Sequence, residues 1–271
     1  MVPSYVIFDG RRRLLGESHK MKALLLAAGF GERLWPITEM TPKCLASIGE
    51  KPLLQHWLEC LADSCQFDEV IVNTHYLAGE VVKFASNYGS PIRLNLSHEE
   101  QLLGPGGTLL KHRSILAESD FLVAHADNFS IIDWPAFFSA HAARPKGCVG
   151  TMMTFDTDSP SACGIVETDA QSRLVEIHEK VANPPGNLAN AAVFIFTPQV
   201  FEIVDKTGNP EVYDISRDIL PLLLQRLMTF KNTLYHKDIG TPEALAQAQR
   251  DYSWSSQLLA ASEPLEGIAL K

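Results

Sequence analysis

One stretch constrains this chain more than any other: an apolar run at residues 22–28 that ends in two glycines and is followed by an arginine and a lysine. A nearly unbroken apolar run of this length favours a strand buried on both faces of a parallel sheet. Gly29 and Gly31 permit positive φ and leave no Cβ in the way, so backbone N–H groups can approach an anion. Arg33 and Lys43 add positive charge beside that loop. The stretch therefore predicts a strand that delivers a phosphate-binding loop.

The loop matches neither of two common phosphate-binding patterns. No Gly-Lys-Ser/Thr follows the glycines, as a Walker A motif requires, and Leu34 stands where a dinucleotide fingerprint has its third glycine. What remains is Gly-x-Gly-x-Arg-Leu-x-Pro, followed by Thr41-Pro42-Lys43. Two glycines after a strand fit a plain turn equally well. The arginine, the prolines and the lysine at these spacings favour a phosphate ligand.

Composition narrows the class of protein. The chain has 271 residues, of which 46% are apolar and 20% charged, so it can bury a sizeable core as one α/β domain. Its net charge of -9 argues against nucleic acid as a partner. No run reaches the roughly 20 apolar residues of a membrane helix, so we expect no membrane association. Five cysteines without a CxxC pair suit ordinary thiols in the cytoplasm, where we expect the protein to be.

Strand and helix patterns alternate through the first half of the chain. The alternation predicts an α/β fold with a mainly parallel, Rossmann-like open sheet and helices on both faces. The expected strands are residues 22–28, 69–73, 92–97 and 121–124, and the expected helices are residues 52–62, 78–88 and 134–143.

The alternation lapses in the second half. The runs 163–168 and 173–178 predict an antiparallel hairpin, and hence a small antiparallel β region laid over the sheet, where an acceptor substrate would sit. The other elements expected here are strands at 148–155, 190–196 and 231–236, and a helix at 214–224 that Pro221 should kink or divide.

The chain ends are expected to lie outside the folded unit. We expect residues 21–250 to form one domain, residues 1–20 to be an N-terminal extension of uncertain origin and residues 251–271 to be a C-terminal tail. The first 20 residues lack the continuous apolar segment of a signal peptide, so Met21 is a candidate for the physiological start.

A second group of glycines and two aspartates stand where ligands bind in open α/β sheets. Residues 99–110 predict a glycine-rich loop in which Gly106 and Gly107 let backbone groups approach a flat ligand, although a plain turn fits as well. Asp127 follows an expected strand, and a carboxylate at that edge can hold a hard cation. Asp238 likewise follows an expected strand, at residues 231–236, and it precedes an expected helix. Aspartates at such positions are also common as turn residues or helix caps.

Together these residues resemble the sugar-1-phosphate nucleotidylyltransferases, and among them the mannose-1-phosphate guanylyltransferases. The opening motif of that family is Gly-x-Gly-Thr/Glu-Arg-Leu-x-Pro-Leu-Thr and then Pro-Lys, and here it reads GFGERLWPIT and then PK. Further matches are LGPGG, HAD, CGIV, EK, NAA and DIGTPE. The resemblance extends from about Met21 to Glu243.

The resemblance implies a role for each matched residue. The nucleotide would be held by Ala27, Ala28, Gly29, Gly31, Arg33, Lys43, Gly106 and Gly107. The sugar phosphate would be held by Gly164, Glu179, Lys180 and Asn190. A magnesium ion, Mg2+, would be held by Asp127 and Asp238. The residues acting directly in catalysis would be Arg33, Lys43, Asp127 and Lys180.

Four positions depart from the family motifs. Pro105, Ala126, Val181 and Ala192 stand where the family usually has threonine, glycine, proline and glycine. Methyl groups added near the sugar can alter which hexose fits.

The implied reaction joins a nucleoside triphosphate and a sugar 1-phosphate to give a nucleoside-diphosphate sugar and pyrophosphate. The motif sequences most resemble those of family members that use GTP with mannose 1-phosphate or a related hexose or heptose 1-phosphate. Uridylyl or cytidylyl transfer to another small phosphate stays open, as does a non-catalytic nucleotide-sugar sensor. A glycosyltransferase would carry an Asp-x-Asp motif, and we interpret Asp156-Thr-Asp158 as a loop coincidence. Association into a homo-oligomer is left open.

Overall fold

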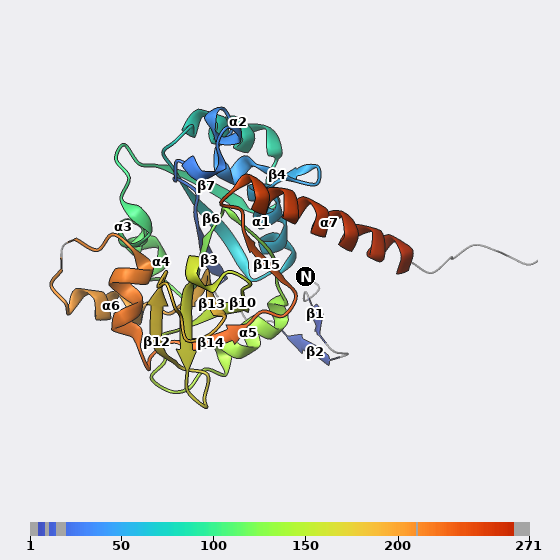
Figure 1. Cartoon of the computed structure of the whole chain (residues 1–271). Helices are drawn as coiled ribbons and strands as arrows, with labels where there is room; N and C mark the ends of the chain where they lie inside the picture. Colours follow the sequence, from blue (N-terminus) through green and yellow to red (C-terminus); the bar gives the residue numbers. More distant parts are fainter. Residues whose placement is uncertain (1–4, 9–10, 15–19, 210, 263–271) are drawn as a thin grey trace, which may run out of the picture.

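The computed structural model describes residues 5–8, 11–14, 20–209 and 211–262 (Figure 1). Its centre is a sheet of nine strands in the order β12-β11-β13-β8-β3-β6-β7, with β10 paired to β13 and β14 paired to β10. These strands are β3 (Met21–Leu26), β6 (Phe67–Thr74), β7 (Arg93–His98), β8 (Phe121–His125), β10 (Gly150–Asp156), β11 (Gly164–Thr168), β12 (Leu174–Glu179), β13 (Leu188–Phe196) and β14 (Met228–Lys231).

The strands β8, β3, β6 and β7 form a parallel unit, as the alternating pattern predicts. Successive side chains of β3 point to opposite faces, and from Ala23 to Leu26 they are all apolar. Leu24 and Leu26 pack with the cluster of α3, α4 and α6, whereas Ala23 and Leu25 pack with that of α1, α2 and α5. The predicted α/β class with helices on both faces is therefore confirmed. The helices are α1 (Leu53–Asp63), α2 (Ala78–Tyr88), α3 (Gly104–Lys111), α4 (Arg113–Leu116), α5 (Trp134–Ala142), α6 (Gln199–Asp205) and α7 (Pro242–Ser262).

The remaining strands make the sheet mixed. β13 runs antiparallel to β8 and to β10, while β14 runs parallel to β10. The predicted antiparallel hairpin is confirmed as β11 and β12, whose register pairs Gly164 with Glu179. It continues the main sheet through one bridge from Ile165 to Ala189 and forms its edge.

Smaller elements frame the loop that follows β3. β4 (Ser47–Ile48) pairs with β5 (Lys51–Pro52), and β9 (Asn128–Ile131) pairs with β15 (Tyr235–Asp238). A third apolar cluster, which includes Leu34, Ile48, Phe129 and Ile239, joins these pairs beneath the loop. β1 (Tyr5–Phe8) and β2 (Arg11–Leu14) pair with each other.

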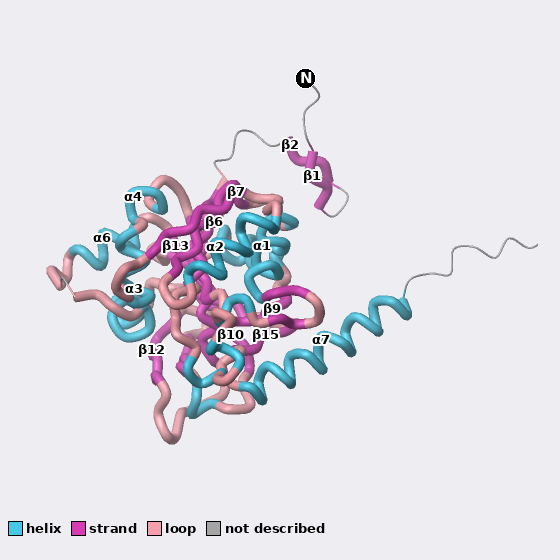
Figure 2. The backbone as a smooth tube through the Cα atoms, turned by 90° about the horizontal axis from the view of Figure 1, so that it is seen from above, coloured by secondary structure: helices cyan, strands magenta, loops and turns pink. Residues whose placement is uncertain are grey.

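Helix α7 begins against this region and then extends away from the body of the molecule in both views (Figures 1 and 2). Gln249 fixes its first half, because its side chain accepts from the backbone N–H of Gly49 at 2.9 Å and donates to the carbonyl of Ser47 at 2.6 Å. The helix is continuous across residue 250, where the sequence pattern placed the end of the domain. No helix among the described residues combines the length and apolarity needed to cross a membrane.

Two predicted elements are wrong. The strand expected at 231–236 is divided, because the Asn232 side chain donates to the carbonyls of Ile131 and Tyr235, each at 3.0 Å, and turns the chain from β14 towards β9. The glycine-rich segment expected to be a loop is helical from Gly104 onwards. The helix expected at 214–224 is divided, as the proline predicts, into a π-helical turn at Ile215–Ile219 and a 3-10 turn at Leu220–Leu223.

Candidate active site

The loop after β3 is shaped by contacts that require glycine. Gly31 adopts a φ of 68°, and a Cβ there would lie 3.0 Å from Cγ2 of Thr38 and 3.2 Å from Cβ of Lys43. The fully buried Thr38 hydroxyl donates to the carbonyl of Gly31 at 2.8 Å. A Cβ at Gly29 would meet nothing within 4 Å, so this residue leaves room for a ligand.

Four predicted site residues meet at one point. The Lys43 ammonium donates to Asp127 at 2.5 Å and to Asp238 at 3.2 Å. The Arg33 guanidinium lies 3.5 Å from the second oxygen of Asp238. Lys43 follows the loop, Asp127 follows β8 and Asp238 ends β15, so three distant segments bring these charges together. The two carboxylates predicted to hold a metal ion thus both contact the same cationic atom, Nζ of Lys43.

Burial and charge act against each other in this cluster. Burial by itself lowers the pKa of Lys43, but Asp127 and Asp238 outweigh it, so the pKa of Lys43 lies above its ordinary value. Burial likewise favours the neutral form of Asp127, yet Lys43 and then His125 hold the pKa of Asp127 below its usual range. Lys43 and Asp127 therefore form an ion pair at neutral pH. Burial raises the pKa of the neighbouring Cys44 thiol to about 12, so this thiol is not an activated nucleophile.

These residues border an open cleft of about 460 Å³. Its lining includes Gly29, Gly31, Arg33, Lys43, Asp127 and Gly240. Arg33 and Gly240 also line an adjoining cleft of about 520 Å³, which contains Asp238. A third hollow of about 460 Å³, lined by Trp134 and Phe138 among others, contains none of the predicted site residues.

The residues predicted to hold a sugar phosphate form a second group. Gly164 lies opposite Glu179, and a Cβ on Gly164 would approach the Glu179 carboxylate to 2.5 Å, so the Glu179 side chain would have to move aside. The Lys180 ammonium lies 3.6 Å from the same carboxylate and is largely exposed. Asn190 accepts from the backbone N–H of Ala192 at 2.9 Å and donates to Ser216 at 3.5 Å.

The sheet links this second group to the first. Asn128, next to Asp127, donates from its buried side chain to the carbonyl of Ala191 at 3.1 Å. Ala191 follows Asn190 on β13, and β13 is bridged to β11 one residue after Gly164. The strands β8, β13 and β11 thus place the two groups on neighbouring strands, at the edge where the parallel strands end.

Gly106 and Gly107 do not lie in a free loop, contrary to the sequence prediction. They are in the first turns of α3, and the backbone N–H of Gly106 donates to the carbonyl of Tyr213 at 2.8 Å. A Cβ on Gly106 would lie 3.0 Å from the Val212 side chain, and one on Gly107 would lie 3.1 Å from the Leu103 side chain. These glycines permit close packing of the chain on itself. The backbone N–H of Ala27 is also occupied, because it donates to Asn73 at 2.7 Å.

Sequence reasoning missed a buried polar network behind the loop. Asn73 is the last residue but one of β6. Its side chain accepts from the backbone N–H of Ala27 and donates to Glu99 at 3.0 Å and to Thr108 at 3.2 Å. The Thr108 hydroxyl donates to Glu99 at 2.6 Å, and the backbone N–H of Leu103 donates to the other oxygen at 3.2 Å. The network therefore ties the start of the phosphate loop to α3. The available signal was a polar side chain at the carboxyl end of an apolar strand.

The chain matches a known family over most of its length. A family model described as nucleotidyl transferase matches residues 22–254. The chain belongs to this family. The chain is 28% identical over 233 residues to the mannose-1-phosphate guanyltransferase of Candida albicans, covering 82% of this chain and 62% of that protein. It is 32% identical over 229 residues to the mannose-1-phosphate guanylyltransferase catalytic subunit beta of Drosophila pseudoobscura pseudoobscura, covering 82% and 60%. The chain thus spans about three fifths of these relatives.

Solved structures of other proteins share the fold of this chain. HddC from Yersinia pseudotuberculosis has a TM-score of 0.72 and 21% identity, with 86% of this chain and 99% of that chain covered. A UDP-glucose pyrophosphorylase complexed with UDP-glucose has a TM-score of 0.73 and 20% identity, with 87% and 99% covered. At such identities the likeness shows the fold alone.

Proposed function

We propose that this nucleotidyl transferase joins a nucleoside triphosphate to a sugar 1-phosphate and releases pyrophosphate. The observation that carries the proposal is the meeting of Lys43, Asp127, Asp238 and Arg33 beside a glycine loop. The phosphate oxygen of the acceptor can attack the α-phosphorus in line, so no protein nucleophile is needed. The protein must hold two anions that repel each other and offset the charge that develops at phosphorus.

The basic side chains divide this task. Arg33, with an exposed planar guanidinium, suits the oxygens of a triphosphate lying over Gly29 and Gly31. Lys43 is a compact charge that can exchange its carboxylate partners for phosphate oxygens. Lys180, exposed at the end of β12, suits the phosphate of the acceptor, while Glu179 and Asn190 suit its hydroxyl groups.

Asp127 and Asp238 fit a magnesium ion. They offer carboxylate oxygens, the donors that Mg2+ prefers, and both already contact one cationic atom, Nζ of Lys43. A bound Mg2+ would act as a Lewis acid and withdraw charge from the reacting phosphoryl group. The role of the two aspartates would be to present their oxygens to one ion where the two clefts adjoin.

We further propose GTP and mannose 1-phosphate, or a related hexose or heptose 1-phosphate, as the substrates, and the cytoplasm as the compartment. The guanyltransferase relatives support this choice of base and sugar, and so does the fold of HddC, of which a complex with GMP-PN is known. All five cysteines are free thiols, which suits a reducing compartment.

A matrix of substrates tests this proposal. Purified protein is mixed with each of GTP, UTP, CTP and dTTP and with mannose, glucose and heptose 1-phosphates, and pyrophosphate release is measured with and without Mg2+. We expect release with GTP and mannose or heptose 1-phosphate, and almost none without the metal. Release of pyrophosphate with UTP or CTP but not with GTP would favour uridylyl or cytidylyl transfer instead. If the protein bound a nucleotide sugar but released no pyrophosphate with any combination of substrates, a non-catalytic sensor would be favoured.

A further inference from the structure

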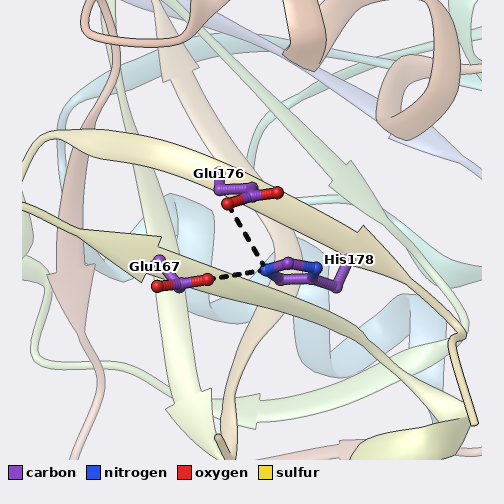
Figure 3. Close-up of side chains that lie close together, drawn as sticks. All are labelled: Glu167, Glu176 and His178. Atoms are coloured by element: carbon purple, nitrogen blue, oxygen red, sulfur yellow. Dashed lines mark hydrogen bonds and ion pairs between the residues drawn. The ribbon is translucent and has the colours of Figure 1, made fainter. Parts of the chain in front are cut away.

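The hairpin at the edge of the sheet carries three side chains that the proposed reaction does not use. Glu167 lies on β11, and Glu176 and His178 lie on β12. Glu167 is directly opposite Glu176 in the register, and His178 is two residues further along the strand, so all three side chains lie on one face. Figure 3 shows the two carboxylates on either side of the imidazole nitrogen.

The distances between these groups fit a metal ion. Nε2 of His178 lies 2.8 Å from Glu167 and 3.9 Å from Glu176, and all three ligand atoms lie within 4.8 Å of one another. Two ligands bound tetrahedrally at about 2.1 Å from zinc are roughly 3.4 Å apart, a value between the two measured distances. Small side-chain rotations therefore suffice to close the three ligands around one ion.

The charges of these three side chains also favour a bound cation. Like charges directly opposite each other on neighbouring strands destabilise a hairpin. Within the described part of the chain, the ion-pair partner of Glu167 and of Glu176 is His178, and neither pairs with lysine or arginine. One imidazole, even when protonated, offsets only one of two negative charges. A divalent cation offsets both.

We propose that Glu167, Glu176 and His178 bind a divalent transition-metal ion of the zinc class, which cross-links β11 and β12. An imidazole nitrogen with two carboxylate oxygens is a donor set that suits zinc, whereas Mg2+ prefers oxygen alone. Both glutamates are exposed, which leaves the remaining coordination position to water. This site is separate from the Asp127 and Asp238 pair and differs from it in containing nitrogen.

Zinc titration of the full chain tests the proposal. Calorimetry is performed with Zn2+ in the presence of excess Mg2+, which competes with Zn2+ for any site that offers oxygen ligands alone. We expect one Zn2+ per chain, and affinity reduced by more than about tenfold in Glu167→Gln and in His178→Ala, because each variant removes a ligand. Glu211→Gln and His98→Ala, which change an exposed glutamate and an exposed histidine elsewhere, should bind Zn2+ like the unaltered chain.

The histidine nitrogen that binds the metal gives a second readout. In a sample with ¹⁵N-labelled histidine, Zn2+ should shift the Nε2 resonance of His178, because that atom faces both glutamates. Circular dichroism confirms that each variant is folded. Failure to bind Zn2+ under excess Mg2+, equal affinity in Glu167→Gln and the unaltered chain, or a shift confined to Nδ1 would each overturn the proposal and leave the three side chains as a hydrogen-bonded ion triad.

Discussion

At the scale of single residues, Gly240 controls where Arg33 can lie. A Cβ on Gly240 would approach the Arg33 guanidinium to 2.8 Å and the Asp238 carboxylate to 3.0 Å. The guanidinium is the mobile end of an exposed side chain, so it can move aside while the fold is kept. We therefore predict that Gly240→Ala lowers kcat/KM by up to about 100-fold through misplacement of Arg33, measured by pyrophosphate release.

The matched control for this prediction is Gly186→Ala. A Cβ there would meet nothing within 4 Å, so activity should be unchanged. If Gly240→Ala retained full activity, Arg33 would not need the position described here.

The backbone of Ala192 is strained, because the residue has a Cβ in a conformation that favours glycine. It adopts a φ of 52° within β13, where the pairing with β10 is irregular. A non-glycine residue is disfavoured in this region of φ. We predict that Ala192→Gly raises the free energy of unfolding by roughly 0.5–1 kcal/mol, measured by urea denaturation.

The neighbouring residue provides the opposite control. Ala191 is buried and has no positive φ, so Ala191→Gly should destabilise the protein by about 0.5–1 kcal/mol. The sequence alone could show that Ala192 replaces a family glycine, but not that the backbone kept the conformation that favours glycine. Equal changes in both variants would show that φ is not the cause.

At the scale of elements, Asn73 joins β6 to β3 and to α3. Its removal would leave the backbone N–H of Ala27 and the Glu99 carboxylate short of a buried partner. Asn73→Ala should therefore lower the free energy of unfolding by about 1–3 kcal/mol, measured by urea denaturation. The exposed Asn187 serves as the comparison, and Asn187→Ala should change stability by less than about 0.5 kcal/mol. A similar small effect at Asn73 would contradict the network.

Elements were predictable from sequence where local pattern and tertiary contact agree. The apolar run of β3 is buried on both faces, and the helix at 78–88 has the predicted bounds. The strand expected at 231–236 failed because Asn232 bonds to Ile131, about a hundred positions earlier in the chain. Gly106 failed as a loop residue because Val212 and Tyr213 pack against it. Contacts between distant segments leave no trace in local periodicity.

At the scale of the whole molecule, the charged cluster could be listed from motifs but its internal pairing could not. The resemblance named Lys43, Asp127 and Asp238, whereas the bonds between them depend on three separate segments of the fold. We predict that Asp127→Asn and Asp238→Asn each lower turnover by about 100-fold or more, because amides hold Mg2+ poorly, with circular dichroism unchanged.

Asp205→Asn is the control for these two variants. Asp205 pairs with Arg113 on the surface and lines neither cleft, so its loss should leave turnover as it was. Normal turnover in Asp127→Asn or Asp238→Asn would exclude that aspartate as a ligand of the catalytic ion.

The contact of Lys43 with both aspartates has a consequence for the order in which ligands arrive. Without substrate, the protein supplies its own counter-ion, and a free metal ion would have to compete with a tethered ammonium for the same oxygens. In the proposed reaction, an incoming triphosphate would give Lys43 new partners and free those oxygens at the same moment. Metal and nucleotide would then bind together, and the protein without nucleotide would bind metal ions weakly.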